Sequence, residues 1–436
     1  MSVFNRDSAD EFARGARALI VYPELTGGSA LSADARLDEA EGLALAIGLQ
    51  VVGKQALRVR APKAATLIGG GQVEAIAEQV EALNADLLIV DGALTAIQQR
   101  NLEDKTKVKV IDRTGLILEI FGERAATAEG RLQVELAHLD YQAGRLVRSW
   151  THLERQRGGF GFLGGPGETQ IEADRRMIRD RMARLRRELE QVQRTRGLHR
   201  ARRKRAPWPV IALVGYTNAG KSTLFNRLTR AGVLAEDMLF ATLDPTLRQI
   251  SLPGVEKAIL SDTVGFVSDL PTQLVAAFRA TLEEVISADI IVHVRDIAHP
   301  ATMAQRDDVM RILKELGIDT AASGRIVELW NKVDLLDNDQ RAEYQNIAEK
   351  QEDIFLISAE TGEGIEAFKA HLAQRIGTAN LTRELWLDGG EGEALAWLHA
   401  KGRVETSEEA DGQIRIVASL NAQNWGQFDK RFQLEN

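Results

Sequence analysis

The sequence lacks cysteine entirely and has only seven histidines, which show no metal-ligand spacing. Disulfide bonds, thiolate metal sites and cysteine nucleophiles are therefore excluded, and the composition is compatible with a reducing compartment. The chain also lacks any uncharged apolar run near the roughly 20 residues that a membrane-spanning helix needs. Its first residues are polar and acidic, so we expect no secretory signal there and a cytoplasmic protein.

Length and apolar content predict a multidomain globular protein of the α/β class. A chain of 436 residues corresponds to roughly three or four folding units. Hydrophobic residues make up 44% of the chain, which is enough to fill the cores of those units. This proportion excludes a disordered chain.

Residues 16–125 alternate strand-like apolar runs with amphipathic helical stretches. Strands are predicted over residues 18–22, 51–59, 87–90 and 108–111, and helices over residues 32–47, 72–83 and 94–102. Such alternation is typical of βα units with a largely parallel sheet. We therefore expect an N-terminal α/β domain over residues 1–130.

Two heptad patterns follow this region. Apolar residues recur at spacings of three and four over residues 132–153 and again over residues 178–192. Residues 158–167, between them, contain six glycines, which suit neither a helix nor a strand. We expect an antiparallel helical hairpin with a glycine-rich tip over residues 131–206; a helical spacer with a flexible connector is the alternative.

The net charge of −8 conceals one strongly basic segment. Residues 174–206 contain fourteen Arg and Lys against four Asp and Glu, so the rest of the chain carries −18. A basic block on an acidic body is typical of contact with nucleic acid or another anionic surface. A solvated helix that its arginines keep soluble is the alternative.

A phosphate-binding loop is predicted near the middle of the chain. An apolar strand over residues 210–214 leads into the pattern Gly215-x-x-x-x-Gly220-Lys-Ser222, and a helical pattern follows. The glycines allow backbone N–H groups to turn toward a β-phosphate. Lys221 supplies a cation to the phosphate oxygens, and the Ser222 hydroxyl can bind Mg²⁺.

The segment that selects the base lies further along. Asn331-Lys332-x-Asp334 follows another predicted strand. A carboxylate there can accept two hydrogen bonds from the N1–H and 2-amino groups of guanine, a donor pair that adenine lacks. The sequence therefore predicts guanine specificity.

Three more loops complete the predicted site. Asp262 ends a strand and can hold Mg²⁺ through a water, while Gly265 offers its N–H to a γ-phosphate. Thr242, preferred over Thr246, offers a hydroxyl to the metal. Residues 354–360 would supply the loop beneath the guanine O6.

Five segments together carry a resemblance to one known family: residues 158–172, 215–222, 240–246, 262–271 and 331–334. In them the chain resembles the HflX family of ribosome-associated GTPases. The first of these segments, a glycine-rich stretch that ends in Gly-Glu-Thr-Gln before a basic helix, is the most family-specific.

The remaining domain boundaries follow from this resemblance and from the element pattern. Residues 207–377 are expected to form a P-loop GTPase domain of the TRAFAC type, similar to Era and Obg. Residues 378–436 show a strand, a helix, two strands and a helix, so we expect a small C-terminal α+β domain there.

Position 266 carries Phe where many GTPases have the glutamine that orients the attacking water. Phenylalanine cannot hydrogen-bond water, so we expect slow basal hydrolysis and an additional source of charge stabilisation. One candidate is a K⁺ ion held by Asn218, as in similar GTPases with asparagine at this position. The other is a partner that orders the loop around Thr242.

The predicted site combines residues from all of these loops. Its catalytic residues are Lys221, Thr242, Asp262, Gly265 and Asn218, and its metal ligands, for Mg²⁺, are Ser222 and Thr242. The predicted nucleotide contacts are Gly215, Tyr216, Thr217, Asn218, Ala219, Gly220, Lys221, Ser222, Thr223, Phe240, Ala241, Thr242, Asp262, Gly265, Asn331, Lys332, Asp334, Ser358, Ala359 and Glu360.

The resemblance implies the large ribosomal subunit as the partner, and a role in splitting or rescuing ribosomes under stress. Hairpin helices of 20 to 25 residues would extend roughly 30–40 Å. Their basic side chains, including those at 202–205, would neutralise rRNA phosphates, and Phe160 and Phe162 would stack on bases. We expect a monomer.

Two other functions stay open. The chain could be an Era- or Obg-like ribosome assembly GTPase, or a non-catalytic RNA-binding scaffold with GTP as a structural ligand. A second nucleotide or an RNA phosphate could also lie at Gly69-Gly70-Gly71, before a helix predicted from residue 72, although a tight structural turn is the favoured interpretation.

Overall fold

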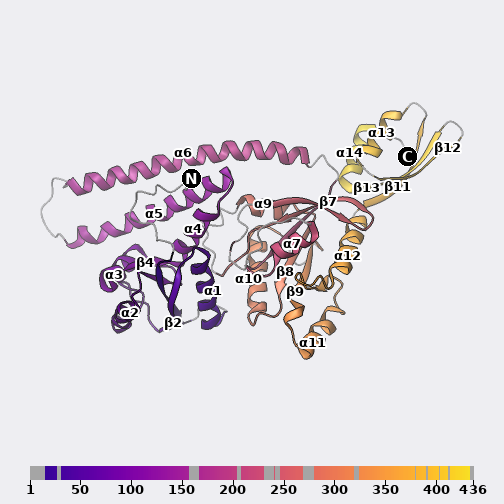
Figure 1. The fold of residues 1–436 in the computed structure, drawn as a ribbon. Helices are drawn as coiled ribbons and strands as arrows, with labels where there is room; N and C mark the ends of the chain where they lie inside the picture. Colours follow the sequence, from indigo (N-terminus) through magenta and orange to yellow (C-terminus); the bar gives the residue numbers. More distant parts are fainter. Residues whose placement is uncertain are drawn as a thin grey trace.

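Three sheets and a pair of long helices make up the described part of the chain (Figure 1). The computed structural model describes residues 15–26, 31–156, 166–203, 208–229, 240, 246–268, 279–318, 324–378, 380–388, 391–401, 403–410 and 413–432.

The first sheet is four-stranded and parallel throughout, with the strand order β2-β1-β3-β4. Its strands are β1 (Arg17–Leu25), β2 (Gln50–Val59), β3 (Leu87–Val90) and β4 (Lys109–Asp112). One face is covered by α1 (Ala33–Ala46) and α4 (Arg113–Arg124), and the other by α2 (Gly70–Ala82) and α3 (Ala96–Thr106). The predicted parallel α/β arrangement is confirmed.

Helix α2 begins two residues earlier than the sequence predicts. Gly69 is its N-cap residue, and its backbone N–H donates to the side chain of Gln72 at 3.0 Å. Gly70 and Gly71 therefore form the first turn of a helix instead of a separate turn.

The sequence patterns do not predict α4, because glycines at positions 115 and 122 lower the helix propensity of this stretch. Asp112 begins the helix, since its carboxylate accepts the backbone N–H of Gly115 at 2.8 Å. The helix is retained because most of it is buried, including Leu116, Ile120 and Phe121. In Figure 1, α1 and α4 lie between the first sheet and the second.

The predicted helical hairpin is present as α5 (Ala128–Gln156) and α6 (Pro166–Arg203), which lie side by side (Figure 1). These helices have 29 and 38 residues, longer than the 20 to 25 expected. Gly167 belongs to α6, so the tip is shorter than predicted, and Phe160 and Phe162 lie outside the described residues. In the described ranges no helix has both the length and the apolarity needed to cross a membrane.

The base of the hairpin is part of the N-terminal core. Val134 and Ala137 of α5 are buried in the same apolar cluster as α4. The hydroxyl of Tyr141 donates to the Asp112 carboxylate at 2.7 Å, and Arg145 pairs with the same carboxylate at 2.9 Å. The hairpin is therefore anchored to the N-terminal core through the first part of α5.

The second sheet has six strands in the order β10-β9-β8-β5-β7-β6, and only β6 and β7 pair antiparallel. Its strands are β5 (Val210–Gly215), β6 (Thr246–Leu252), β7 (Val255–Asp262), β8 (Ile290–Asp296), β9 (Ile326–Asn331) and β10 (Ile354–Leu356). Helices α7 (Lys221–Thr229) and α12 (Ile365–Thr378) cover one face, and α9 (Arg279–Ser287) and α10 (Thr302–Glu315) the other. A short helix, η1 (Val333–Leu335), and α11 (Asn338–Ala348) follow β9.

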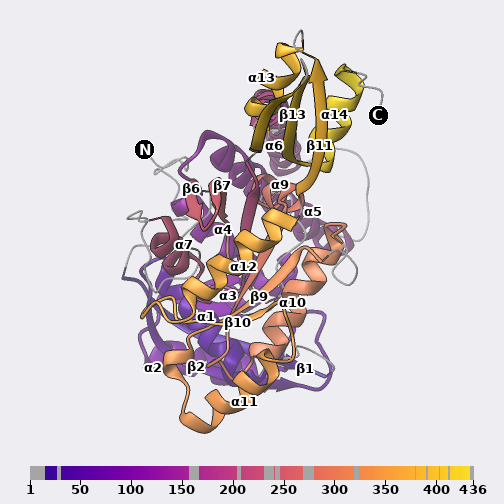
Figure 2. The ribbon, with the colours of Figure 1, turned by 90° about the vertical axis from the view of Figure 1, so that its right-hand side faces the viewer.

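The third sheet is antiparallel and three-stranded, with the order β11-β13-β12. Its strands are β11 (Asn380–Asp388), β12 (Arg403–Ala410) and β13 (Gln413–Asn421), and its core includes α13 (Gly392–Lys401) and α14 (Ala422–Phe432). Figure 2 shows this unit beyond the end of α12, away from the N-terminal sheet. The predicted order of its elements is confirmed, while the exact domain boundaries stay a prediction.

The packing of α4 can be tested with two Gly→Ala variants. A Cβ on Gly115 would lie 2.7 Å from the Tyr141 hydroxyl oxygen and 2.8 Å from a side-chain carbon of Ile111, whereas one on Gly144 of α5 meets nothing within 4 Å. We expect Gly115→Ala to lower the free energy of unfolding by roughly 1–3 kcal/mol. Gly144→Ala, the matched control, should raise it by about 0.5–1 kcal/mol, because alanine favours helix.

Thermal unfolding followed by circular dichroism measures both changes. Equal shifts in the two variants would contradict the close packing of α4 against α5.

Candidate nucleotide-binding site

The predicted phosphate-binding loop connects β5 to α7, and its glycines are required by geometry. Gly215 has φ +151° and Gly220 has φ +91°. A Cβ on Gly215 would lie 2.2 Å from the carbonyl oxygen of Val294, and one on Gly220 would lie 2.2 Å from Nδ2 of Asn331. Neither position accepts a larger residue, so the loop approaches β8 and β9 as closely as a backbone can.

Lys221, the first residue of α7, is buried beneath this loop. Its Nζ donates to the carbonyl oxygen of Tyr216 at 2.7 Å. Burial lowers the pKa of Lys221 to about 8, and the charge of Asp262 only partly opposes this shift. Anionic phosphates near Nζ would favour the charged form of the lysine.

Ser222, the predicted magnesium ligand, and Asp262, predicted to hold the ion through a water, lie side by side. The Ser222 hydroxyl donates to the Asp262 carboxylate at 2.9 Å, and Asp262 is fully buried at the end of β7. Both groups offer oxygen, which Mg²⁺ prefers. Among the described residues, no cluster of three or more His, Asp or Glu could hold a metal ion by itself. Ser222 and Asp262 therefore fit a Mg²⁺ ion that is held mainly by nucleotide phosphates and water.

The segment after Asp262 lies directly on the phosphate-binding loop. The N–H of Phe266 donates to the Gly215 carbonyl at 3.0 Å, and the N–H of Thr217 donates to the Phe266 carbonyl at 2.7 Å. A Cβ on Gly265 would lie 2.9 Å from Thr217 Cα and 3.0 Å from Lys221 Nζ. Gly265 is therefore placed beside the lysine that would meet a γ-phosphate.

The ring of Phe266 is buried in the apolar core that the GTPase domain shares with α1 and α4. The Phe266 side chain therefore contributes to the packing between the GTPase domain and the N-terminal domain, in addition to being unable to orient a water.

The predicted base-binding loops converge on Asn331. Its Nδ2 donates to the Ala219 carbonyl at 2.8 Å, and its Oδ1 accepts the N–H of Ala359 at 2.8 Å. Lys332, with φ +68°, pairs with Asp296 at 2.8 Å. Asn331 thereby joins the phosphate-binding loop to the loop predicted to lie beneath guanine O6.

Asp334 lies in η1 and is exposed. An exposed carboxylate at this position is accessible to the N1–H and 2-amino groups of a guanine base.

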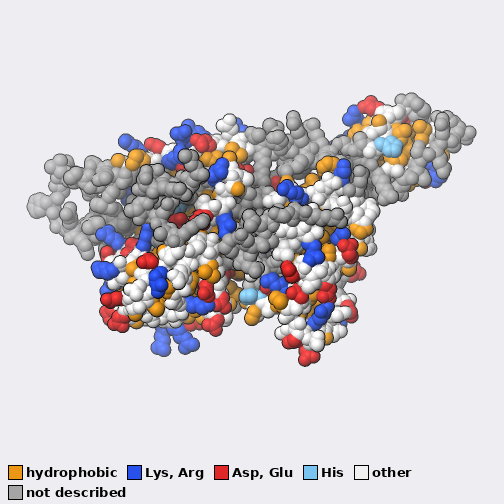
Figure 3. Space-filling view, in the orientation of Figure 1, with side chains coloured by type: hydrophobic (Ala, Val, Ile, Leu, Met, Phe, Trp, Pro, Cys, Tyr) orange, Lys and Arg blue, Asp and Glu red, His pale blue; other side chains and the backbone are white. Residues whose placement is uncertain are grey.

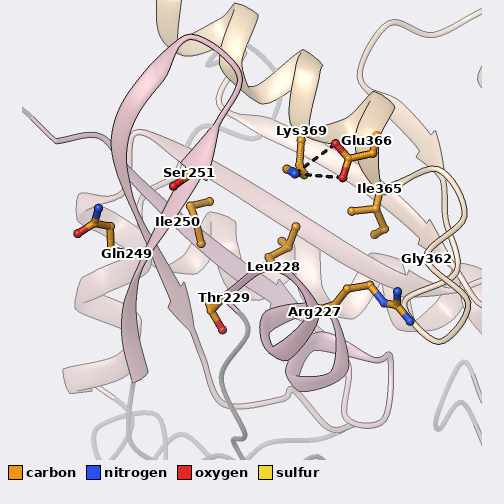
Figure 4. A pocket seen from close by; sticks show the side chains of 10 residues that line it. All are labelled: Arg227, Leu228, Thr229, Gln249, Ile250, Ser251, Gly362, Ile365, Glu366 and Lys369. Carbon is orange, nitrogen blue, oxygen red and sulfur yellow. Dashed lines mark hydrogen bonds and ion pairs between the residues drawn. The ribbon is translucent and has the colours of Figure 1, made fainter.

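Arg227 of α7 holds the predicted O6 loop and was missed by the sequence analysis. Its Nε donates to the Ala359 carbonyl at 2.6 Å, and its Nη2 bonds the Glu360 carbonyl. Figure 4 shows Arg227 reaching toward the turn at Gly362, beside a cavity of about 470 Å³ between α7, β6 and α12. None of the predicted site residues lines that cavity. Ser358, fully buried, accepts the Thr361 N–H at 3.0 Å and closes the turn.

The remaining predicted residues fall into two groups. Asn218, with φ +58°, lies in the phosphate-binding loop, and Thr223 lies in the first turn of α7. Phe240 is buried, whereas Ala241 and Thr242 lie outside the described residues.

A carboxylate from outside the GTPase domain also reaches the site, which the sequence analysis did not foresee. Glu39 of α1 accepts the Tyr216 hydroxyl at 2.6 Å, the Arg113 guanidinium at 2.6 Å and the backbone N–H of Ser268 at 3.2 Å. Burial alone would raise the pKa of Glu39, but Arg113 and the hydrogen bonds from Ser268 and Tyr216 hold it below the usual value. The group therefore stays ionised.

Two arginines complete this buried cluster. Arg113 pairs with Asp91 at 2.5 Å, and Arg36 pairs with the same carboxylate at 3.0 Å. Arg36 also donates to the Ser268 hydroxyl at 2.8 Å. The residues of this cluster are far apart in the sequence and meet only in the folded structure, so no local motif could have revealed them.

The pKa of Lys221 gives a pH prediction. A lysine with a pKa near 8 loses its charge as the pH rises through 8, and bound phosphates stabilise only the charged form. Between pH 7 and pH 8.5 the affinity for GTP should therefore fall about fourfold. Calorimetry at pH 8 in two buffers of different ionisation enthalpy should show uptake of protons on binding. A flat pH profile without proton uptake would contradict a buried, shifted lysine.

Comparison with known protein families gives matches along most of the chain. The families are described as "GTP-binding GTPase N-terminal" over residues 34–122, "GTP-binding GTPase Middle Region" over 124–203, "50S ribosome-binding GTPase" over 210–332 and "HflX C-terminal domain" over 343–435.

Individual proteins match over nearly the full length. A protein of Magnetococcus marinus named GTPase HflX is 50% identical over 387 residues, 88% of each chain. The Escherichia coli protein of the same name is 40% identical over 423 residues, 97% of each chain. A solved structure of a GTP-binding protein from Sulfolobus solfataricus in complex with GDP is 23% identical, with a TM-score of 0.45, and covers 83% of this chain and 99% of that chain.

The expected P-loop GTPase fold is confirmed by the second sheet and its loops. Since relatives at least 40% identical extend over nearly all of both chains, the chain belongs to the HflX family of GTPases.

Proposed function

We propose that this protein is a GTP-hydrolysing switch that binds the large ribosomal subunit and splits or rescues stalled ribosomes under stress. The observation that carries the proposal is the convergence of the predicted site. Residues from four separate loops, at positions 215–222, 262–265, 331–334 and 358–360, meet at one edge of the second sheet.

The proposed roles follow from this geometry. Backbone N–H groups of the loop after Gly215 bind the phosphates, and Lys221 neutralises them. Asp334 reads guanine, and Asn331 holds the two loops that enclose the nucleotide. Ser222, whose hydroxyl bonds Asp262, would hold Mg²⁺ together with Thr242, and the ion supplies positive charge to the phosphates when bound.

Hydrolysis of GTP needs positive charge that stabilises the transition state, in addition to that of Lys221 and Mg²⁺. Phe266 is turned into the core, so the charge comes either from K⁺ at Asn218 or from the ribosome. The first candidate rests on the position of Asn218 within the phosphate-binding loop, where its backbone has φ +58°.

The basic face of α6 supports a nucleic-acid partner. Its arginines at positions 176, 179, 184, 186 and 187 are exposed, and Figure 3 shows Lys and Arg side chains along this helix. Exposed guanidinium groups bind phosphates well. The match of the GTPase domain to a family described as a 50S ribosome-binding GTPase supports the large subunit as the source of those phosphates.

The alternatives differ in measurable ways. A splitting factor converts intact ribosomes to subunits in the presence of GTP, which sedimentation detects, whereas an assembly GTPase leaves intact ribosomes unchanged. A scaffold with GTP as a structural ligand releases no phosphate under any partner condition.

Turnover with purified large subunits tests the proposal most directly. We expect phosphate release from GTP but not from ATP, and a higher rate with subunits than without them in K⁺ buffer. Equal rates with and without subunits would contradict stimulation by the partner.

Base selection by Asp334 gives a second prediction. Asp334→Asn loses the charged acceptor of guanine, and a hydrogen bond to a charged group is worth about 1.5–3 kcal/mol. GTP affinity should therefore fall at least about tenfold, measured by calorimetry. Asp337→Asn, which caps α11 nearby, is a matched control and should bind GTP like the parent protein.

The role of α6 is tested by removing its charge. The triple variant Arg184→Gln, Arg186→Gln, Arg187→Gln should weaken binding to the large subunit and flatten its salt dependence, because about three phosphate contacts are lost. GTP affinity should stay unchanged. The control triple Arg311→Gln, Lys314→Gln, Arg341→Gln removes the same charge from α10 and α11. Equal loss of binding in both triples would mean that only net charge matters.

A further inference from the structure

The first residue of α4 reaches the loop that follows Gly265. The Nε and Nη2 atoms of Arg113 donate to the Ser268 carbonyl at 3.2 and 2.9 Å, and Nη2 also lies 3.0 Å from the Ser268 hydroxyl. Arg113 and Ser268 are 3% and 2% exposed. Their interaction is thus shielded from water. Hydrogen bonds to a charged group are strong in such a buried environment.

The neighbouring residue reaches the hairpin in the opposite direction. Asp112 accepts the Tyr141 hydroxyl at 2.7 Å and pairs with Arg145 at 2.9 Å, both from α5. It also accepts the N–H of Gly115 and so fixes the first turn of α4. Burial raises the pKa of Tyr141, and the charge of Asp112 adds to this, so the hydroxyl remains a donor.

Two adjacent residues therefore hold two distant elements. Asp112 and Arg113 are adjacent residues at the start of a packed helix, so a displacement of the helix start would carry both of them. A shift of Ser268 acts on Arg113, and a shift of Asp112 acts on α5.

The other end of α4 touches a second loop of the site. The rings of Phe121 and Phe240 meet edge to face, with centroids 4.8 Å apart. Phe240 is buried two residues before the predicted metal ligand Thr242. Helix α4 thus contacts segments that flank both the predicted γ-phosphate contact and the predicted metal contact.

We propose that Asp112 and Arg113 couple the nucleotide site to the helical hairpin. Arg113 is a positioning residue, which holds Ser268 and thereby keeps Gly265 beside Lys221, and Asp112 holds α5. The presence of a γ-phosphate is in this way transmitted to the base of α5. The coupling itself is independent of the partner, and only its use on the ribosome rests on the proposed function.

The direction of the effect follows from the position of Gly265. Gly265 lies against Thr217 and Lys221, where its N–H can meet a γ-phosphate, and Arg113 holds Ser268 three residues further on. Releasing Ser268 adds an ordering cost to GTP binding that GDP, which lacks the γ-phosphate, does not incur. Loss of the coupling therefore lowers the preference for GTP over GDP.

The experiment is a double-mutant cycle on the full-length chain without ribosomes. Arg113 itself is unsuitable, because its loss leaves Glu39 buried without its paired cation and removes one of the two arginines that pair with Asp91. Ser268→Ala and Tyr141→Phe each remove one hydroxyl. The measured quantity is the ratio of dissociation constants for GDP and a non-hydrolysable GTP analogue, each carrying the same fluorophore.

We expect Ser268→Ala and Tyr141→Phe each to lower the preference for GTP over GDP about fivefold or more. A factor of about five is the lower end of the range that is typical of coupling between two sites. The double variant should show less than the product of the two single effects, because both substitutions weaken the same connection through Arg113 and Asp112. Ser268→Thr, which keeps the hydroxyl, should retain the parent ratio. Tyr344→Phe in α11 is the control, since its ring packs on Trp330 and away from the γ-phosphate.

Three results would overturn the proposal. The first is an unchanged or increased GTP preference in Tyr141→Phe. The second is single effects that multiply within about a factor of two, as expected for independent sites. The third is an equal change in Tyr344→Phe. Loss of affinity for both nucleotides in parallel would indicate a merely structural role and would overturn it as well.

Discussion

The rest of the structure depends on one buried carboxylate. Glu39 of α1 lies where α1, α4 and the GTPase domain meet, and its hydrogen-bond partners come from α4 and the GTPase domain. Removing charged groups from water costs several kcal/mol for each ion, and only complete pairing offsets this cost. Because Tyr216 and Ser268 are among the partners, this buried cluster joins the N-terminal domain directly to the nucleotide loops.

Much of the site was predictable because each of its loops is a short contiguous segment whose function requires particular residue types. The turn from Gly215 to Gly220 needs glycine for backbone reasons, and Asn331 needs its amide to bridge two loops. Such demands fix residue types at fixed spacing, so a sequence pattern reveals them. The parallel sheet of the N-terminal domain was predictable for a similar reason, since regular alternation of strands and helices leaves few other arrangements.

What the sequence did not reveal depends on contacts between distant positions. Glu39 and Ser268 are 229 residues apart, and neither belongs to a local motif. Helix α4 was missed because burial against α1 and α5 outweighs the low helix propensity of its two glycines. Arg227 was missed because it binds only backbone carbonyls, which leave no signature in the sequence of the loop that it holds.

Hydrogen–deuterium exchange of the full-length protein with GDP and with a non-hydrolysable GTP analogue tests the central claim most directly. If the buried cluster unites the two domains, the γ-phosphate will increase protection together in residues 264–268, in the first turn of α4 and in α5 around Tyr141. Protection that changes only within the GTPase domain, while α4 and α5 exchange identically in both nucleotide states, would contradict the account.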